Sequence, residues 1–463
     1  MANFHQAHQR SLSQLLTFGI AVYIMLWVAV FNGYPIVFDD TGEYLVDSFS
    51  LAQSPYRSII YSIFIRLVSW GMTPWLVVLA QCAITIYILR AVFEYAVPES
   101  PEPRRERICF LGLVAFLAFA TSLPWYLGQL MPDVFTGLAF LSAFLLLYDS
   151  KLSLERTVLL SLILAISVGS HLSNFMSLGL VLSVVLVLRI FDRARQFWPN
   201  RSAKGIVAFV LLPILASAGV VVSSNWYRGF GFRLSAGTQI FLLGRLIDSG
   251  LAGEYLEQQC KVEQLTPCKY LPDLPRNNFL WGSHPLLAEM GGWIGGRAEA
   301  SRIVSGTIRR YPIRFLEECG KQTLREVVIF KPDDENYPIR SGYTADVFEQ
   351  FYPGDLPKYR LTKQWSGRLG SVAQRLYPFY EAVFWSSLCA GLVLLIRRHS
   401  RSDPANRLLI LTLIFLFANA LVTASVSGVH NRYQGRVAWM IGLCCAAYVI
   451  PLLLNRWNPR PGI

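Results

Sequence analysis

The sequence predicts an all-α polytopic membrane protein with about ten transmembrane helices, interfacial helices in the first outer loop and one large extracytoplasmic loop. The 463 residues are 53% hydrophobic and only 16% charged, whereas a soluble domain has about 25% charged residues. The mean hydropathy is +0.40, and long apolar runs alternate with short basic stretches. The net charge of +12 does not indicate nucleic-acid binding, because most basic residues cluster between apolar runs.

Ten apolar runs are long enough to be predicted as spans, since a transmembrane helix needs about 20 apolar residues. They are 15–36, 74–97, 108–127, 132–149, 157–173, 175–191, 205–224, 379–396, 407–427 and 436–454. The first run is too long for the apolar core of a signal peptide and lacks a small-residue cleavage site, so we interpret it as the first span.

The distribution of Arg and Lys predicts the orientation of these spans. Alternate loops carry basic residues, namely Arg10, Arg104, Arg105, Arg107, Lys151, Arg156, Arg193, Arg195, Arg201, Lys204, Arg397, Arg398, Arg401, Arg407, Arg456 and Arg460. The short opposite loops at 125–131 and 172–175 carry none. Because cytoplasmic loops are enriched in basic residues, both termini are predicted to be cytoplasmic.

Three regions follow from this topology: a seven-span module at 1–224, an extracytoplasmic loop domain at 225–378 and three C-terminal spans at 379–463. The loop domain contains Cys260 and Cys268, a pair that is predicted to form a disulfide outside the cytoplasm.

Local patterns predict helices outside the spans. In the first outer loop, a short helix is expected at 41–52 and an interfacial helix at 56–70. Residues 297–330 are expected to form two amphipathic helices that break at Tyr311 and Pro312.

Unusual polar residues gather at the predicted outer ends of the spans, while the middles hold almost no ionisable residues. Members of this set are Asp39, Asp40, Gln129, Asp133, His171, Asn174, Asn225, Arg228, His430, Arg432, Tyr433 and Arg436. Such a distribution indicates chemistry at a membrane surface, because transporters more often place charges near the midplane.

Several short motifs share this placement. They are Phe38-Asp-Asp-Thr-Gly-Glu-Tyr44, the helix at 56–70, Met131-Pro-Asp133 and Ile308-Arg-Arg-Tyr-Pro-Ile-Arg-Phe-Leu316. Together they resemble the GT-C superfamily of polytopic glycosyltransferases, which includes protein O-mannosyltransferases and lipid A aminoarabinose transferases. The resemblance is best over 1–224. The chain departs from well-described members by having three predicted spans after the large loop.

The resemblance implies a bacterial inner-membrane glycosyltransferase with its active face outside the cytoplasm. The implied reaction moves a hexosyl or pentosyl group from a polyprenyl-phosphate-linked donor to a lipid, glycan or protein acceptor. Asp39 or Asp40 would be the general base, and Asp40 is favoured. Two alternatives stay open: Asp40 and Glu43 would also make a helix capping box, and the carboxylates would also suit a metal.

Arginines would bind the phosphate of the leaving group. Arg432 and Arg436 are the strongest candidates because no acidic residue lies near them in the sequence; headgroup anchoring is the alternative. Arg57 is a weaker candidate.

The remaining candidates are assigned to substrate binding: Asp133, His171, Asn174 and Tyr433. Asp133 would otherwise cap the fourth span, and His171 would otherwise be structural. A divalent cation held by Asp40, Asp133 and His171 is a further alternative, and no cofactor is assigned.

Three other functions compete with this assignment. An O-antigen ligase or polymerase would be expected to lack the acidic first loop. A lipid or solute transporter or flippase would be expected to show midplane charges or internal repeats. A non-catalytic scaffold would leave the clustered polar residues unexplained.

Overall fold

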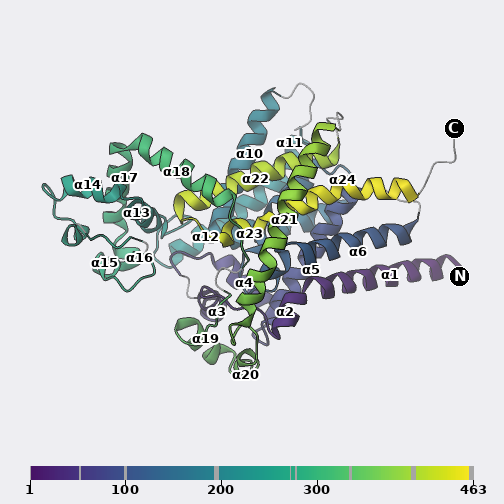
Figure 1. Ribbon diagram of the computed structural model, residues 1–463, viewed down its shortest axis with the longest axis horizontal. Helices are drawn as coiled ribbons and strands as arrows, with labels where there is room; N and C mark the ends of the chain where they lie inside the picture. Colours follow the sequence, from purple (N-terminus) through teal and green to yellow (C-terminus); the bar gives the residue numbers. More distant parts are fainter. Residues whose placement is uncertain are drawn as a thin grey trace.

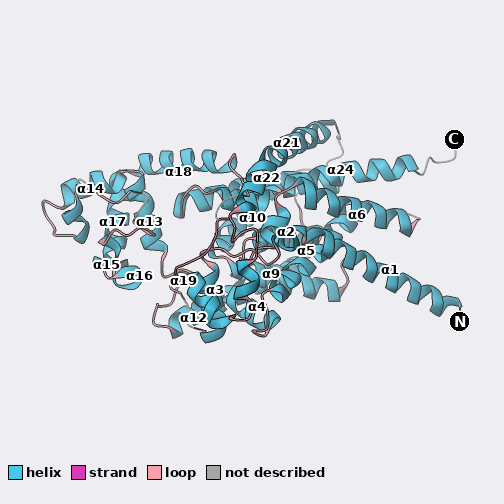
Figure 2. Ribbon diagram, turned by 60° about the horizontal axis from the view of Figure 1, so that its bottom comes forward, coloured by secondary structure: helices cyan, strands magenta, loops and turns pink. Residues whose placement is uncertain are grey.

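The computed structural model describes residues 2–51, 54–98, 102–191, 198–271, 273–276, 279–332, 336–397 and 403–457, with side chains described between 12 and 454. Within these ranges the regular elements are helices, as Figure 2 shows, and the one β-contact is an isolated parallel bridge between Ile36 and Gln129. The all-helical prediction is therefore confirmed for the described residues.

Twelve α-helices and one π-helical turn make up the first half of the chain. They are α1 (Ala2–Met25), α2 (Trp27–Asn32), α3 (Thr41–Ser50), α4 (Ile59–Ser69), α5 (Trp75–Ala96), α6 (Pro103–Ala120), α7 (Leu123–Leu127), α8 (Val134–Tyr148), α9 (Leu154–Ser170), α10 (Leu172–Phe191), α11 (Ala203–Ile206), η1 (Val207–Leu211) and α12 (Leu212–Tyr227). The short helices expected at 41–52 and 56–70 correspond to α3 and α4.

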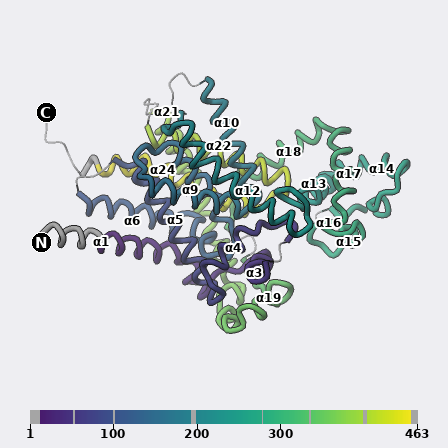
Figure 3. The backbone as a smooth tube through the Cα atoms, turned by 180° about the vertical axis from the view of Figure 1, so that it is seen from behind, coloured from purple at the N-terminus to yellow at the C-terminus, as the bar shows by residue number. Residues whose placement is uncertain are grey.

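The second half begins with a lobe and returns to the helical bundle. Its elements are α13 (Thr238–Asp248), α14 (Leu251–Gln259), η2 (Thr266–Tyr270), α15 (Leu286–Glu289), α16 (Gly292–Gly295), α17 (Arg297–Arg310), α18 (Pro312–Val327), α19 (Tyr343–Phe351), α20 (Leu356–Arg360), α21 (Arg368–Arg397), α22 (Pro404–Val426), α23 (Asn431–Ala438) and α24 (Met440–Trp457). Figure 1 shows the lobe of α13–α17 at one end, while α1, α6 and α24 extend toward the other, and Figure 3 shows the same arrangement from behind.

Six helical segments among the described residues are long and apolar enough to cross a membrane, which supports a multi-pass membrane protein. They are Trp75–Ala96, Leu172–Phe191, Ala203–Tyr227, Arg368–Arg397, Pro404–Val426 and Asn431–Leu454. These segments overlap six of the ten predicted spans, so the prediction of ten is not confirmed.

The other four predicted spans coincide with helices that are short or interrupted. The predicted span 15–36 is divided between α1 and α2, which ends before Gly33 in the left-handed conformation (φ 91°). Helix α8 has 15 residues, all of them buried, and its length of about 22 Å is less than the hydrocarbon thickness of about 30 Å. Its apolar character therefore reflects a position inside the protein.

The predicted loop domain 225–378 contains two parts that pack differently. Helices α13–α17 surround a separate apolar core with Ile240, Leu246 and Ile303 at its centre. The Cys260–Cys268 disulfide lies in this lobe, as predicted. By contrast, Phe330 and Phe348 are buried in the core of the main bundle.

Helix α18 connects the lobe to the bundle (Figure 2). The predicted break at Tyr311 and Pro312 is confirmed, because α17 ends at Arg310 and α18 starts at Pro312. Proline favours the first turn of a helix and restricts the residue before it, so the local sequence suffices to set this boundary.

Candidate functional site

The acidic pair is held beside the start of α8 by backbone pairing. The amide of Ile36 donates to the carbonyl of Gly128 (2.8 Å), and the amide of Leu130 donates to the carbonyl of Ile36 (2.9 Å). Thr41 adds a side-chain bond, since its Oγ1 donates to the Leu130 carbonyl at 3.1 Å. Residues 38–41 and 130–133, far apart in the sequence, therefore lie together.

Asp40 precedes α3 but does not cap it with its side chain. Its carboxylate instead pairs with Arg57 and with Nη1 of Arg432 at 3.3 Å. Glu43 also turns away from the helix start, accepting from Nε of Arg57 at 3.1 Å and from the hydroxyl of Tyr56. The capping-box interpretation is therefore wrong, because both carboxylates are recruited by Arg57.

Six side chains of alternating charge form a continuous series, which we call the charge chain. In order they are Glu43, Arg57, Asp40, Arg432, Asp133 and Arg436. Oδ1 of Asp133 lies 3.6 Å from Nε of Arg432 and 3.2 Å from Nη1 of Arg436. No acidic residue lies near Arg432 and Arg436 in the sequence, but the fold brings Asp40 and Asp133 to them from other segments.

Burial changes along the charge chain. The side chains of Asp133 and Arg436 are 0% exposed, whereas that of Asp40 is 18% exposed. At the buried end, Asp133 Oδ2 and Arg436 Nε have no hydrogen-bond partner among the described residues. The charge chain thus runs from a fully buried pair, Asp133 and Arg436, to a partly exposed end at Asp40 and Glu43.

Ion pairs with Asp40 and Glu43 hold the Arg57 guanidinium at the open end of the charge chain. Burial by itself would lower the pKa of Arg57, but Asp40, Tyr44 and Glu43 outweigh it and raise the pKa above the usual value. Arg57 therefore stays charged, and its guanidinium joins two carboxylates on one helix start.

His171 and Asn174 lie at the buried end of the charge chain. Nη2 of Arg436 donates to Oγ of Ser173 at 3.1 Å, and that oxygen lies 2.7 Å from Nδ1 of His171. His171 sits in the turn before α10, outside the candidate spans. Burial and then the repulsion of Arg436 and Arg432 lower its pKa well below the usual value, so the imidazole is neutral at physiological pH. Asn174 is buried and donates to the carbonyl of Ser167 at 2.9 Å.

Tyr433 orders both arginines of α23. The Cζ atoms of Arg432 and Arg436 each lie 5.3 Å from the centre of its ring, and its hydroxyl lies 2.7 Å from Oγ of Ser427. Arg432 also lies 4.4 Å from the ring centre of Phe38. Aromatic faces attract guanidinium groups, so these rings fix the arginine side chains.

Asp39 is separated from the charge chain although it is adjacent to Asp40 in the sequence. It is exposed, and its Oδ2 accepts from the hydroxyl of Tyr337. Its backbone carbonyl accepts from Thr344, whose backbone lies so close to Gly42 that a Cβ there would stand 2.9 Å from the Thr344 Cα. The two aspartates therefore have different surroundings: one is open and one is paired.

A metal site is not assembled by the candidate residues. Within the described part of the chain, no group of three or more His, Cys, Asp and Glu side chains is suitably placed to hold a metal ion. Arg432 also lies between Asp40 and Asp133, where its positive charge opposes a cation.

Sequence reasoning missed several partners of the candidate residues. Glu43 was considered only as a capping residue, and Ser173, Tyr337, Thr344 and Asn419 were not assigned a role at all. Asn419 Oδ1 accepts from Nη2 of Arg436 at 3.2 Å. The available signal was the polar character of Asn419 inside an apolar span, where polar side chains usually have partners.

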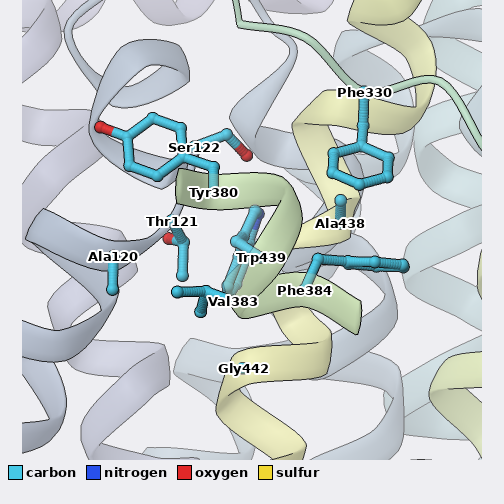
Figure 4. A pocket seen from close by; sticks show the side chains of 10 residues that line it. All are labelled: Ala120, Thr121, Ser122, Phe330, Tyr380, Val383, Phe384, Ala438, Trp439 and Gly442. Atoms are coloured by element: carbon cyan, nitrogen blue, oxygen red, sulfur yellow. The ribbon is translucent and has the colours of Figure 1, made fainter. Parts of the chain in front are cut away.

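A small cavity lies apart from this cluster. Its volume is about 20 Å³, enough for about one water molecule. Figure 4 shows it between Phe330, Tyr380 and Trp439. None of the predicted site residues lines it, so it is not the candidate site.

Neither the family models, nor the curated proteins, nor the solved structures with which the chain was compared include a match.

Proposed function

We propose that this protein is a membrane glycosyltransferase that moves a sugar from a polyprenyl-phosphate-linked donor to an acceptor hydroxyl. The observation that carries the proposal is the open end of the charge chain, where Asp40, Arg57 and Arg432 pair at a partly exposed position and the exposed Asp39 is the preceding residue in the sequence. A carboxylate beside fixed guanidinium groups combines a proton acceptor with binding groups for a phosphate.

In the proposed reaction, the acceptor oxygen attacks the anomeric carbon of the donor sugar. The bond between that carbon and the phosphate oxygen breaks, and its electron pair leaves with the lipid phosphate. The acceptor proton passes to a carboxylate. No redox partner is needed.

The different surroundings of Asp39 and Asp40 support different roles for the two aspartates. Asp40 is engaged by two arginines, Arg57 and Arg432, so its carboxylate oxygens are occupied by ion pairs. Asp39 is exposed, and its carboxylate accepts a hydrogen bond from the hydroxyl of Tyr337. We therefore assign the general base to Asp39 and the positioning of Arg57 and Arg432 to Asp40, which reverses the preference drawn from the sequence.

Arg57 and Arg432 are the proposed phosphate ligands. A guanidinium carries five N–H donors. Arg57 pairs with Asp40 and Glu43, and Arg432 pairs with Asp40 and Asp133, so a bound phosphate would share these guanidinium groups with the carboxylates. Arg436 is fully buried behind them and is proposed to support the site together with Asp133, His171, Asn174 and Tyr433.

The proposed setting is the bacterial inner membrane, with both termini cytoplasmic and the charge chain on the extracytoplasmic side. The basic loops between predicted spans support this orientation.

A transporter is the second candidate, and the fully buried Asp133–Arg436 ion pair favours it. Buried ionisable pairs within membrane proteins often belong to ion or proton pathways. Proteoliposomes distinguish the two: a transporter moves solute or lipid without sugar transfer, whereas the glycosyltransferase labels an acceptor.

The decisive experiment compares Asp39→Asn with Asp40→Asn in membranes supplied with radiolabelled polyprenyl-phosphate hexose and pentose donors. Loss of a general base lowers a rate by about 10²–10⁴-fold, so we expect this loss for Asp39→Asn with normal expression. Asp346→Asn is the matched control, because Asp346 is exposed on neighbouring α19. If Asp39→Asn and Asp40→Asn both keep full transfer activity while folding normally, the proposed chemistry is wrong.

A further inference from the structure

Four aromatic rings from separate segments form a compact cluster next to the open end of the charge chain. They belong to Tyr56, Phe241 in α13, Trp281 and Trp293 in α16. The centroids of Tyr56 and Trp293 are 4.3 Å apart, those of Trp281 and Trp293 are 5.5 Å apart, and those of Tyr56 and Trp281 are 5.7 Å apart. Phe241 completes the set at 5.1 Å from Trp293. We call these four residues the aromatic platform.

The aromatic platform remains open on one side. Trp281 is 61% exposed, and the other three rings are partly exposed. If these rings only joined the lobe to the bundle, complete burial would stabilise that contact most, because the stabilisation grows with the apolar area that is buried. A tryptophan left this open at the edge of a four-ring cluster is instead available to a ligand.

Tyr56 connects the aromatic platform to the charge chain. Its hydroxyl donates to Oε1 of Glu43, whose other oxygen accepts from Arg57, and the Arg57 Cζ lies 5.3 Å from the Tyr56 ring centre. Apolar ring faces and charged hydrogen-bonding groups therefore meet at one residue. Sugars need this combination, because the C–H groups of a pyranose pack on rings while its hydroxyls bond to polar side chains.

The position of the rings argues against a role as membrane anchors. Aromatic anchors gather where spans meet the interface, as Trp226 and Tyr227 do at the end of the candidate span Ala203–Tyr227. Trp293 instead packs against the separate core of the lobe, and Phe241 packs on Trp293. The close approach of Gly237 to both Tyr56 and Trp293, where a Cβ would stand 2.9 Å and 3.3 Å from their atoms, fixes the platform to the first outer segment.

We propose that the aromatic platform is a saccharide-binding subsite that holds the sugar of the substrate beside Glu43 and Arg57. This inference rests on the proposed function for the direction of transfer, but the binding of saccharide by the platform is a separate property. The ligand class is a neutral pyranose saccharide, stacked on Trp281 and Trp293 with hydroxyls toward Glu43.

The test uses the full chain in detergent and saturation-transfer NMR with three probes: maltotriose, mannotriose and diacetylchitobiose. At least one is expected to bind through its ring C–H protons. Trp281→Ala is expected to weaken that binding about tenfold, since ring contacts contribute up to about 1.5 kcal/mol each. Trp281→Tyr, which keeps a ring, should restore most of it. Trp226→Ala is the matched control, because Trp226 is equally open, at 68% exposed, and lies outside the platform.

Two results would overturn the proposal: no binding of any of the three probes, or unchanged binding in Trp281→Ala. A membrane role is tested separately in nanodiscs of brominated phospholipid. The emission of Trp281 is the difference between the unaltered protein and Trp281→Ala, and the emission of Trp226 is obtained in the same way from Trp226→Ala. If the brominated lipid quenches both emissions equally strongly, the platform contacts lipid and the saccharide proposal is wrong.

The same probes separate this proposal from the proposed reaction. Asp39→Asn should bind saccharide as the unaltered chain does. Binding without sugar transfer in the unaltered chain would contradict the glycosyltransferase assignment and leave the platform standing. Sugar transfer without saccharide binding that depends on the platform would contradict the platform proposal and leave the glycosyltransferase assignment standing.

Discussion

The two ends of the charge chain use the same residue types in opposite physical settings. At the buried end, Asp133 and Arg436 are fully enclosed, while at the open end Asp40 keeps 18% of its side chain exposed. A fully buried ion pair is costly to form and more costly to break, whereas a solvent-exposed pair contributes little and is easily separated. The same arginine–aspartate pairing therefore supports the structure at the buried end and is suited to chemistry at the open end.

The largest effect should follow from breaking the buried pair. Arg436→Met leaves the buried Asp133 with only the more distant Arg432 and should destabilise the protein by about 3 kcal/mol, because the buried charge loses its nearest partner. Thermal unfolding in detergent, followed by size-exclusion chromatography, measures the loss.

The double variant Arg436→Met with Asp133→Leu is the matched control for that loss. It removes both charges and should regain most of the stability. If Arg436→Met alone unfolds no earlier than the unaltered protein, the buried end is not structural and the contrast between the two ends fails.

A second, smaller effect tests whether the two ends are coupled through α23, which carries both arginines. The buried Glu326 of α18 accepts from the amide of His430 at 2.9 Å, directly before α23. A carboxylate at a helix start satisfies an orphan N–H and complements the helix dipole. Glu326→Ala should cost about 1–2 kcal/mol.

Glu326→Gln keeps an acceptor oxygen and serves as the comparison variant. It should retain most of the stability, and its sugar-transfer rate should fall less than that of Glu326→Ala. Equal rates in both variants and in the unaltered protein would show that the orientation of α23 does not depend on this contact.

The contrast between the ends also explains what the sequence could and could not predict. The Tyr311–Pro312 break and the Cys260–Cys268 pair depend on neighbouring residues, so local rules sufficed. The partners Asp40 and Arg432 lie 392 positions apart, and only helix packing decides that they meet. A polar residue could be assigned to the outer end of a span, but its partner could not.

The predicted number of ten spans is not confirmed for a related reason. Hydropathy reports that a run is apolar and does not distinguish lipid from protein as its surroundings. Helix α8 is apolar throughout because the protein encloses it. The capping box failed because Glu43 satisfies Arg57, which lies 14 positions away, and a rule confined to one helical turn cannot detect that competitor.

The smallest effect concerns Asp47, a buried carboxylate near the open end of the charge chain. Burial raises its pKa to about 7, compared with about 3.9 in an unfolded chain. The folded protein therefore holds the Asp47 proton more tightly than the unfolded chain does. The destabilising contribution of ionised Asp47 is complete above about pH 7, shrinks as the pH falls and vanishes below about pH 4.

Asp47→Asn removes this contribution, so it should raise the unfolding temperature by about 3 °C at pH 8 and by progressively less toward pH 4. Thermal unfolding of both proteins at several pH values measures the difference. Asp346→Asn, at an exposed position on α19, should show no such pH-dependent gain. The opposite result would be an unfolding-temperature difference between Asp47→Asn and the unaltered protein that increased as the pH fell. It would show that the fold stabilises Asp47 as an anion. The open end would then be as tightly paired as the buried end.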